Sequence, residues 1–260
     1  MNRLLLFLFP MALIVFNSPR VFGMHILLDP GHGGNDRGAV RGHLRESEIT
    51  LEVAKKLERL LKQDTQFQVS LTRSEDRFVS LSERTEISDQ SNADLFLSIH
   101  VNASPDVRAR GAEFYFQNQL PPDEDSLFLA SLEMEGHGHE TGTKDKPHEE
   151  NPRGVALTDL KSDVANIVRD LHRNSKIFLS SQLAENLMLN WAGTKKSRRH
   201  VIRQAPFYVV SHVNVPSALV EIGFLSHKRE GQQLADSAYQ DKLADSIYRG
   251  LVNFKEFVDK

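Results

Sequence analysis

The feature that most constrains the fold of this chain is a regular alternation of two hydrophobic patterns. After residue 23, short apolar runs alternate with longer segments in which apolar residues recur every three or four positions. The first pattern predicts buried strands and the second predicts amphipathic helices. Such alternation is typical of a parallel or mostly parallel twisted sheet with helices on both faces. We therefore expect one α/β domain over residues 24–260.

The expected elements follow one another along most of the chain. Strands are predicted at residues 25–29, 67–73, 94–101, 111–116, 205–210 and 217–224. Helices are predicted at residues 46–62, 80–92, 157–171, 175–191 and 241–257. In the first helix, the face that packs on the sheet is marked by Ile49, Val53, Leu57 and Leu60.

The amino terminus has a different pattern. A positive start at Arg3 precedes an apolar run over residues 4–16, and small and polar residues follow up to Gly23. This order is typical of a secretory signal peptide over residues 1–23. We expect its removal, no stable membrane span in the mature chain, and location in the periplasm, or outside a cell that lacks an outer membrane. A retained anchor is the alternative, although the run is short for a bilayer span.

Composition narrows the choice of partner. The whole chain has a formal net charge of −3, and residues 1–23 contain two arginines and no acid. A nucleic-acid-binding domain usually presents a basic face, so we expect no nucleic-acid partner. There is no cysteine, which excludes disulfides and attachment of lipid through cysteine.

Residues 117–156 interrupt the alternation with a segment rich in charge, proline and glycine. Only residues 127–135 within it favour a helix. A loop this long in a compact domain is usually functional or disordered. We interpret it as a solvated loop, and the acids that would block a site if it closed are Glu133, Glu135 and Glu140. The sequence GHGHE at 136–140 contains metal-ligating residue types, but we interpret it as a surface loop.

Ionisable side chains fall at one edge of the expected sheet. His32 follows the first strand within a glycine-rich loop, and His100 and Glu221 lie on later strands. Glu46 opens the first helix on the face that packs on the sheet. In open α/β sheets, ligands bind beyond the carboxyl ends of the strands, so these four groups are expected to converge there.

The residue types at this edge favour metal-assisted hydrolysis. Two imidazoles and one carboxylate form a zinc site that keeps a position open for water. A further carboxylate can accept the proton of that water, and such a site hydrolyses amides. The glycines around His32 would let it approach the ion without a crowding side chain.

Each residue also has an ordinary explanation. A glycine-rich loop resembles a phosphate loop, although the Gly-Lys-Ser/Thr of a P-loop is missing. Glu46 is a usual first-turn carboxylate, and His100 is a usual core histidine. Glu221 is harder to explain in this way, because a buried carboxylate without a partner costs several kcal/mol.

Several segments together resemble the zinc-dependent N-acetylmuramoyl-L-alanine amidases of bacterial cell-wall turnover. The matching segments are ILLDPGHGGNDRGAV, LRESEITLEVAKKL, VSLTRSEDRFVSLSERTEISDQSNADLFLSIHVNAS, GAEFYF, RQAPFYVV and VPSALVEIGFLSH. They occur in the order of that family and cover almost all of residues 25–260. Ser47 and His227 depart from the residues usual in the family, and neither stands at a ligand position.

The resemblance implies a role for each ionisable residue and a substrate. One zinc ion would be held by His32, Glu46 and His100, and Glu221 would be the catalytic carboxylate. The implied reaction is cleavage of the amide between N-acetylmuramic acid and L-alanine of the stem peptide, in peptidoglycan or muropeptides. In some relatives a helix covers the zinc until a partner withdraws it, so a protein activator is implied if residues 117–156 occlude the site.

Further site residues are expected from their positions. Asp29 or a backbone carbonyl is expected to hold the second nitrogen of His32, as is common for metal-bound histidine. Asn102, Arg73 and Arg203 are candidates for contact with substrate, although internal ion pairing explains the arginines equally well. We expect a monomer. Two alternatives to the amidase remain: another zinc peptidase that cuts within the stem peptide, and a non-catalytic wall-binding relative.

Overall fold

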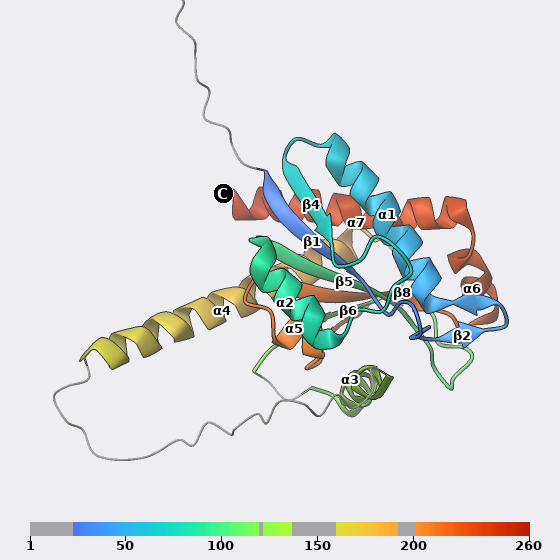
Figure 1. Ribbon diagram of the computed structural model, residues 1–260, viewed down its shortest axis with the longest axis horizontal. Helices are drawn as coiled ribbons and strands as arrows, with labels where there is room; N and C mark the ends of the chain where they lie inside the picture. The colour runs from blue at the N-terminus through green and yellow to red at the C-terminus, as the bar shows by residue number, and fades with distance from the viewer. Residues whose placement is uncertain (1–22, 120–121, 137–159, 192–200) are drawn as a thin grey trace, which may run out of the picture.

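A six-stranded sheet forms the centre of the molecule in a computed structural model, which describes residues 23–119, 122–136, 160–191 and 201–260 (Figure 1). The strand order is β4-β1-β5-β8-β6-β7. The strands are β1 Met24–Pro30, β4 Phe67–Leu71, β5 Leu95–Asn102, β6 Glu113–Phe116, β7 Val201–Gln204 and β8 Ser217–Phe224. All neighbours pair in parallel except β6 and β8, which are antiparallel. A short hairpin, β2 Val40–Arg41 and β3 Leu44–Arg45, precedes the first helix.

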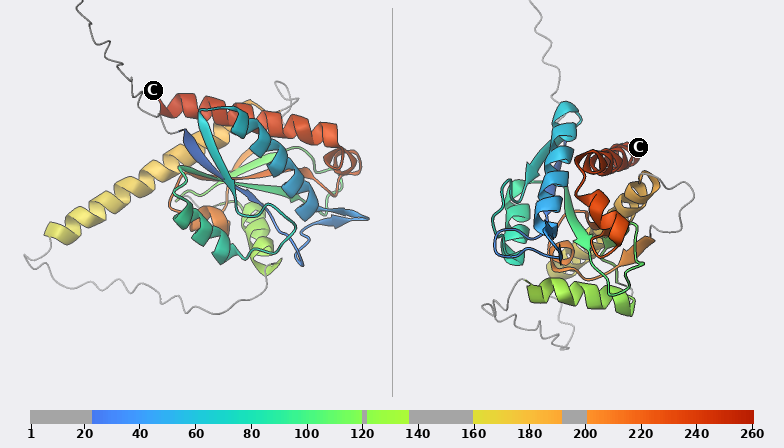
Figure 2. Two further views of the ribbon diagram at one scale, coloured as in Figure 1. Left: turned by 45° about the horizontal axis from the view of Figure 1, so that its top comes forward. Right: turned by 90° about the vertical axis from the view of Figure 1, so that its right-hand side faces the viewer.

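Helices cover both faces of this sheet (Figure 2). One face carries α1 Glu46–Gln63, α4 Leu160–Leu189, α6 Lys228–Leu234 and α7 Ser237–Val258. The opposite face carries α2 Leu81–Ser91, α3 Glu124–Gly136 and α5 Tyr208–Ser211. Helix α2 is capped by Ser80, whose hydroxyl accepts a hydrogen bond from the backbone N–H of Glu83.

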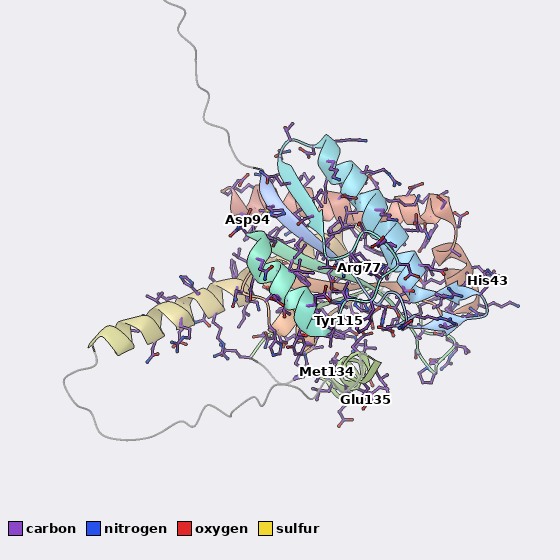
Figure 3. The ribbon with its side chains drawn as sticks, in the orientation of Figure 1. His43, Arg77, Asp94, Tyr115, Met134 and Glu135 are labelled. Atoms are coloured by element: carbon purple, nitrogen blue, oxygen red, sulfur yellow. The ribbon has the colours of Figure 1, made fainter. Side chains whose placement is uncertain are left out.

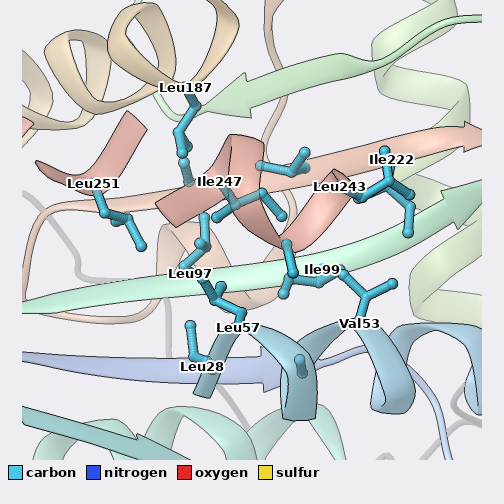
Figure 4. Close-up of a cluster of buried hydrophobic side chains, with 14 of the residues drawn as sticks. Leu28, Val53, Leu57, Leu97, Ile99, Leu187, Ile222, Leu243, Ile247 and Leu251 are labelled. Carbon is cyan, nitrogen blue, oxygen red and sulfur yellow. The ribbon is translucent and has the colours of Figure 1, made fainter. Parts of the chain in front are cut away.

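The larger core lies between the sheet and the first of these layers (Figure 4). Strand residues such as Leu97 and Ile222 meet Leu57 of α1 and Ile247 of α7, and each is at most 1% exposed. Their alternation along the strands and helical spacing on the helices are the patterns that predicted these elements. This packing fixes the start of α1 against the sheet edge.

The register of the sheet brings three strand ends together. Pro30 of β1 pairs with Ile99 of β5, and His100 of β5 pairs with Glu221 of β8. Because these strands are parallel, the residues that follow them emerge at one edge of the sheet. The amino terminus of α1 reaches the same edge.

Two helices expected on either side of residue 172 are one continuous helix, α4. The residues between them, His172 to Asn174, include neither proline nor glycine, so nothing in the backbone ends the first helix. The first half of α4 extends beyond the sheet (Figures 1 and 2).

The strand predicted over residues 205–210 is wrong. Strand β7 lies just before it, and α5 occupies its second half. Pro206 has no backbone N–H for a sheet ladder. Val209 and Val210 favour strands, yet both are buried in the smaller core from a helical turn, so tertiary packing overrides their preference.

The signal peptide predicted over residues 1–23 lies almost wholly outside the described residues, and so does the GHGHE sequence beyond Gly136. Within the described chain, no helix is both long and apolar enough to cross a membrane.

Candidate metal centre

Four side chains from distant parts of the chain meet at the carboxyl edge of the sheet. One donor atom each from His32, Glu46, His100 and Glu133 lies within 4.8 Å of the others. Nε2 of His32 is 3.2 Å from Oε2 of Glu46, and Nδ1 of His100 is 3.1 Å from Oε1 of Glu46. Two imidazole nitrogens and a carboxylate are donors that zinc accepts, so the three residues expected from the sequence fit this ion.

His32 reaches the centre through an unusual backbone conformation. Its φ is +58°, in the left-handed region that few residues other than glycine adopt. Gly33 and Gly34 follow with φ of +131° and +61°. A Cβ at Gly33 would meet the backbone oxygen of Arg77 at 2.2 Å, so the loop turns tightly against its neighbour. The glycines therefore let the chain turn sharply and present the imidazole to the sheet edge.

Two further glycines leave room for the ligands themselves. A Cβ on Gly31 would lie 2.5 Å from the ring of His100. A Cβ on Gly38 would lie 2.5 Å from both Oε2 of Glu46 and the ring of His32. Any side chain at either position would therefore displace a donor atom.

Glu46 is held in place by backbone groups as well as by histidines. Its Oε1 accepts from the N–H of Val101 at 2.8 Å, and its Oε2 accepts from the N–H of Ala39 at 2.8 Å. Burial raises the pKa of Glu46, but the charges of His32 and His100 lower it to about 2. Glu46 is therefore an ionised, oriented carboxylate at the first turn of α1.

The imidazole of His100 is buried between acids. Burial lowers the pKa of His100, but the carboxylates of Glu133 and Glu46 raise it to about 10. A metal ion must displace that proton, because only neutral imidazole binds metal. The same negative surroundings favour a cation at this position.

Glu221 stands beside His100 and has a different environment from Glu46. It is 1% exposed, and its Oε2 has no hydrogen-bond partner among the described residues. Burial raises the pKa of Glu221 well above the ordinary value, and the nearby carboxylates of Glu46 and Glu133 add to this. A buried carboxyl beside His100, with one oxygen that has no partner among the described residues, is suited to exchanging a proton with a group bound there.

The second nitrogen of His32 is held by Asp36 and not by Asp29. Nδ1 of His32 donates to Oδ2 of Asp36 over 2.7 Å. The fully buried Asp29 instead pairs with Arg84 and accepts from Thr72 and Ser98. The two acids have different partners because Asp29 lies within strand β1, whereas Asp36 lies in the same loop as His32, where its Oδ1 accepts from the N–H of Gly38.

Arg73 supports the loop and does not face the substrate side. Its guanidinium is buried and donates to the carbonyls of Pro30, Gly31 and Ser47. Burial lowers the pKa of Arg73 to about 10, so it remains charged at neutral pH. Arg73 therefore joins the glycine loop to the start of α1, an internal role that the sequence allowed as the alternative to its predicted contact with substrate.

Asn102 and Arg203 lie at a cavity of about 330 Å³ beside the centre, between α3 and the ends of β5, β6 and β8. The amide of Asn102 donates to Glu113 at 2.9 Å, and Arg203 donates to Glu113 at 3.1 Å. Both are therefore internally bonded and at the same time open to a cavity. Glu113 was not expected from the sequence, since a glutamate at the start of a strand has no distinguishing pattern.

The fourth member of the centre is Glu133, one of the three acids that the sequence offered as groups that could block a site. Its two oxygens lie 3.6 Å from Nε2 of His32 and 3.6 Å from Nδ1 of His100. It is carried by α3, which buries Ala130 and Ser126 against the body, so residues 124–136 are a packed helix and not a solvated loop. Glu135 is exposed on α3 (Figure 3), and Glu140 lies outside the described residues. His43, which precedes Glu46 by three residues and has a side chain that could bind metal, is exposed at the hairpin turn.

The sequence of this chain matches a known protein family. The model of the family described as N-acetylmuramoyl-L-alanine amidase matches residues 26–253. The chain belongs to the N-acetylmuramoyl-L-alanine amidase family. Membership confirms the resemblance seen in the sequence and assigns the chain to a class of enzymes, the peptidoglycan hydrolases.

Relatives of this amidase-family chain differ in length. The probable amidase AmiB of Haemophilus influenzae is 31% identical, covering 97% of this chain and 56% of the relative. A putative amidase of Buchnera aphidicola is 30% identical, covering 88% of this chain and 93% of the relative. The chain thus spans little more than half of the first relative and nearly all of the second.

A solved structure confirms the α/β class with its mostly parallel sheet. The CwlD amidase from Clostridioides difficile, in complex with the GerS lipoprotein, has a TM-score of 0.64 and 26% identity. The similarity covers 90% of this chain and 100% of that one.

Proposed function

We propose that this chain is an exported zinc amidase that cleaves the bond between N-acetylmuramic acid and L-alanine of the stem peptide. The observation that carries the proposal is the convergence of His32, Glu46 and His100, with the unpaired Glu221 beside them, in a chain of this family. Neither a ligand nor the buried acid is missing, which argues against a non-catalytic wall-binding relative.

Each residue of the centre has one task in this proposal. His32, Glu46 and His100 hold the ion, and Asp36 orients His32 through its Nδ1. A zinc ion held by these residues would supply a water whose pKa is lowered to about 7 and would polarise the substrate carbonyl. A cation bound at the centre would favour the ionised form of Glu221, which could then accept the proton of the attacking water, and the same carboxyl would donate a proton to the departing amine of alanine.

The proposal is tested by the products of peptidoglycan digestion. Purified sacculi and soluble muropeptides are treated with the enzyme, with and without a chelator, and the products are separated by mass. We expect intact stem peptides beginning with L-alanine and glycans with free lactyl groups, and we expect both to vanish with the chelator. Shortened stem peptides would show instead a peptidase that cuts within the stem.

We further propose that the metal centre is closed to substrate in the conformation that the structure describes. The carboxylate of Glu133 occupies space next to both histidines, where water and the substrate carbonyl must bind. Burial raises the pKa of Glu133, but the charges of His100 and His32 lower it well below its usual value, so the blocking group is ionised. The helix must move for substrate to enter.

A protein activator is the proposed means of moving α3. The C. difficile relative was solved with a lipoprotein bound, which shows that one member of this family assembles with another protein. We extend to this chain only the general point that a protein partner binds, and we propose that here the partner displaces α3.

Replacing Glu133 by alanine is expected to raise the basal rate. The ion pairs of Glu133 with the two histidines are lost, and if they contribute as other interactions with charged groups do, about 1.5–3 kcal/mol, the open population should increase about 10- to 100-fold. The measurement is turnover of a soluble muropeptide by the purified chain. Glu135→Ala, two positions along the same helix but exposed, is the matched control. An unchanged rate in Glu133→Ala would show that α3 does not limit entry.

A further inference from the structure

Helix α3 presents two acids to the body of the protein, and only one of them faces the metal centre. Glu133 lies against the histidines near the end of the helix. Asp123, just before the helix begins, lies against Arg203 of β7, with both carboxylate oxygens 3.3 Å from Nη1. Asp123 also accepts from the N–H of Ser126, as a helix cap does. The second contact needs an explanation that blocking of the centre does not give.

Arg203 is held as a rigid donor at this position. Its Nε donates to Oε1 of Glu113 at 3.1 Å, while Oε2 of Glu113 accepts from Asn102 and Tyr115 at 2.9 and 2.8 Å. Glu113 is therefore shared among three donors. Arg203 turns a terminal nitrogen outward, where its side chain is 30% exposed and Asp123 is about half exposed. An exposed pair of this kind contributes little and is easily exchanged.

This network lines the cavity beside the metal centre. Asn102, Glu113, Tyr115 and Arg203 form one wall of the 330 Å³ cavity, and Phe128, Leu129 and Leu132 of α3 form another. Tyr115 lies between the sheet and α3 (Figure 3). Asn102 follows His100 on β5, and Glu113 pairs with Glu221 across the sheet. The residues that line the cavity are therefore close neighbours, along β5 and across the sheet, of two residues of the centre.

We propose, on the basis of the proposed amidase function, that Arg203 binds a free carboxylate of the stem peptide. While α3 covers the centre, Asp123 lies on Arg203 where that carboxylate would bind. In the same conformation Glu133 lies against the histidines where the reacting carbonyl would bind. A guanidinium fixed by a neighbouring acid recognises carboxylates with defined geometry. The stem peptide offers two sources: the α-carboxylate of its second residue, a γ-linked glutamate, and a side-chain carboxylate on its third residue when that is a diamino dicarboxylic acid.

The length of α3 favours the third residue. Asp123 and Glu133 are about ten residues apart, which corresponds to about 15 Å at the helical rise of 1.5 Å per residue. An extended peptide covers that distance in about four to five residues, at 3.3–3.6 Å each. The carboxylate of the second residue is too close to the scissile amide to span it. Three residues of ordinary backbone also fall short, but the γ-linkage of glutamate and the long side chain of the third residue add to the reach of its carboxylate.

The test varies the carboxylate and the arginine together. Three muramoyl tripeptides are compared: one with free glutamate and diaminopimelate, one with the glutamate amidated, and one with lysine as third residue. The chains are Glu133→Ala alone and combined with Arg203→Gln, Arg203→Lys or Asp123→Asn. We expect Arg203→Gln to raise KM about tenfold for both diaminopimelate substrates, with kcat changed less than about twofold and no effect on the lysine substrate. Lysine at position 203 should restore part of the loss.

Asp123→Asn is expected to act in the opposite direction. It removes the acid that competes for Arg203, so KM for the diaminopimelate substrates should be lower in the Glu133→Ala, Asp123→Asn chain than in Glu133→Ala alone. An effect of Arg203→Gln that depends on the amidation of glutamate would assign the second residue as the source. Equal effects on all three substrates would overturn the proposal and leave Arg203 only as an anchor of α3.

A binding measurement separates this inference from the proposed function. Calorimetry with the free tripeptide L-Ala-γ-D-Glu-diaminopimelate needs no turnover. About tenfold weaker binding to the Glu133→Ala, Arg203→Gln chain than to Glu133→Ala supports the subsite even if no amide is cleaved, whereas equal binding overturns it. Cleavage without discrimination would overturn the inference alone, and absence of metal-dependent cleavage would overturn the proposed function alone.

Discussion

Glu221→Gln is expected to retain one zinc ion and to lose turnover by about 10²- to 10⁴-fold, the usual contribution of a positioned acid–base group. Glutamine preserves the shape of the side chain but cannot accept a proton from water or donate one to the departing amine. Binding of zinc should survive because the donor group is formed by His32, Glu46 and His100, with Glu133 as the fourth member.

The measurement combines zinc analysis with rates on a soluble muropeptide. Glu135→Gln makes the same chemical change on an exposed helix position and serves as the control. The Glu133→Ala background is used for both, so that closure of α3 does not limit the rate. Normal turnover in Glu221→Gln would remove this residue from the proton transfer.

His100→Ala is expected to lose both the metal and the activity. The imidazole supplies one of the two nitrogen donors, and the remaining pair of His32 and Glu46 cannot complete a tetrahedral site. Glu133 is close enough to replace a lost ligand, since it lies 3.6 Å from the nitrogen of His100. The substitution is therefore made with and without Glu133→Ala, and we expect the double variant to hold less zinc.

Zinc content after dialysis is the direct measurement, with activity as the second. His43→Ala is the matched control, because His43 is exposed at the turn of the hairpin (Figure 3). His43→Ala should keep its full zinc content and its rate. Undiminished zinc in the His100→Ala, Glu133→Ala chain would mean that the ligand set is wrong.

The convergence of His32, Glu46, His100 and Glu221 could be predicted because it depends on strand direction. Parallel strands end at one edge, so residues that follow separate strands meet there whatever their distance in the sequence. Glu46 could be added because the helical face that carries Ile49 and Val53 must contact the sheet. Their individual roles in zinc binding and proton transfer stay predictions that the variants above test.

Residues one contact away from the centre could not be assigned in the same manner. Asp29 and Asp36 are both near His32 in sequence, and only the left-handed turn at His32 directs its Nδ1 to Asp36. Arg73 follows a strand as a substrate-binding residue would, yet it is buried under the glycine loop. Such assignments depend on side-chain direction within a turn, which residue patterns do not encode.

The amino-acid sequence alone determined the class of fold and the edge at which the ionisable groups meet, because hydrophobic periodicity and strand order fix both. The matching segments indicated the family. Only the tertiary structure decided that α3 lies across the cavity, with Glu133 against the histidines and Asp123 against Arg203. The pattern of α3 is weak because few of its residues are buried. Its position depends on where the rest of the molecule presents charges to pair with its two acids.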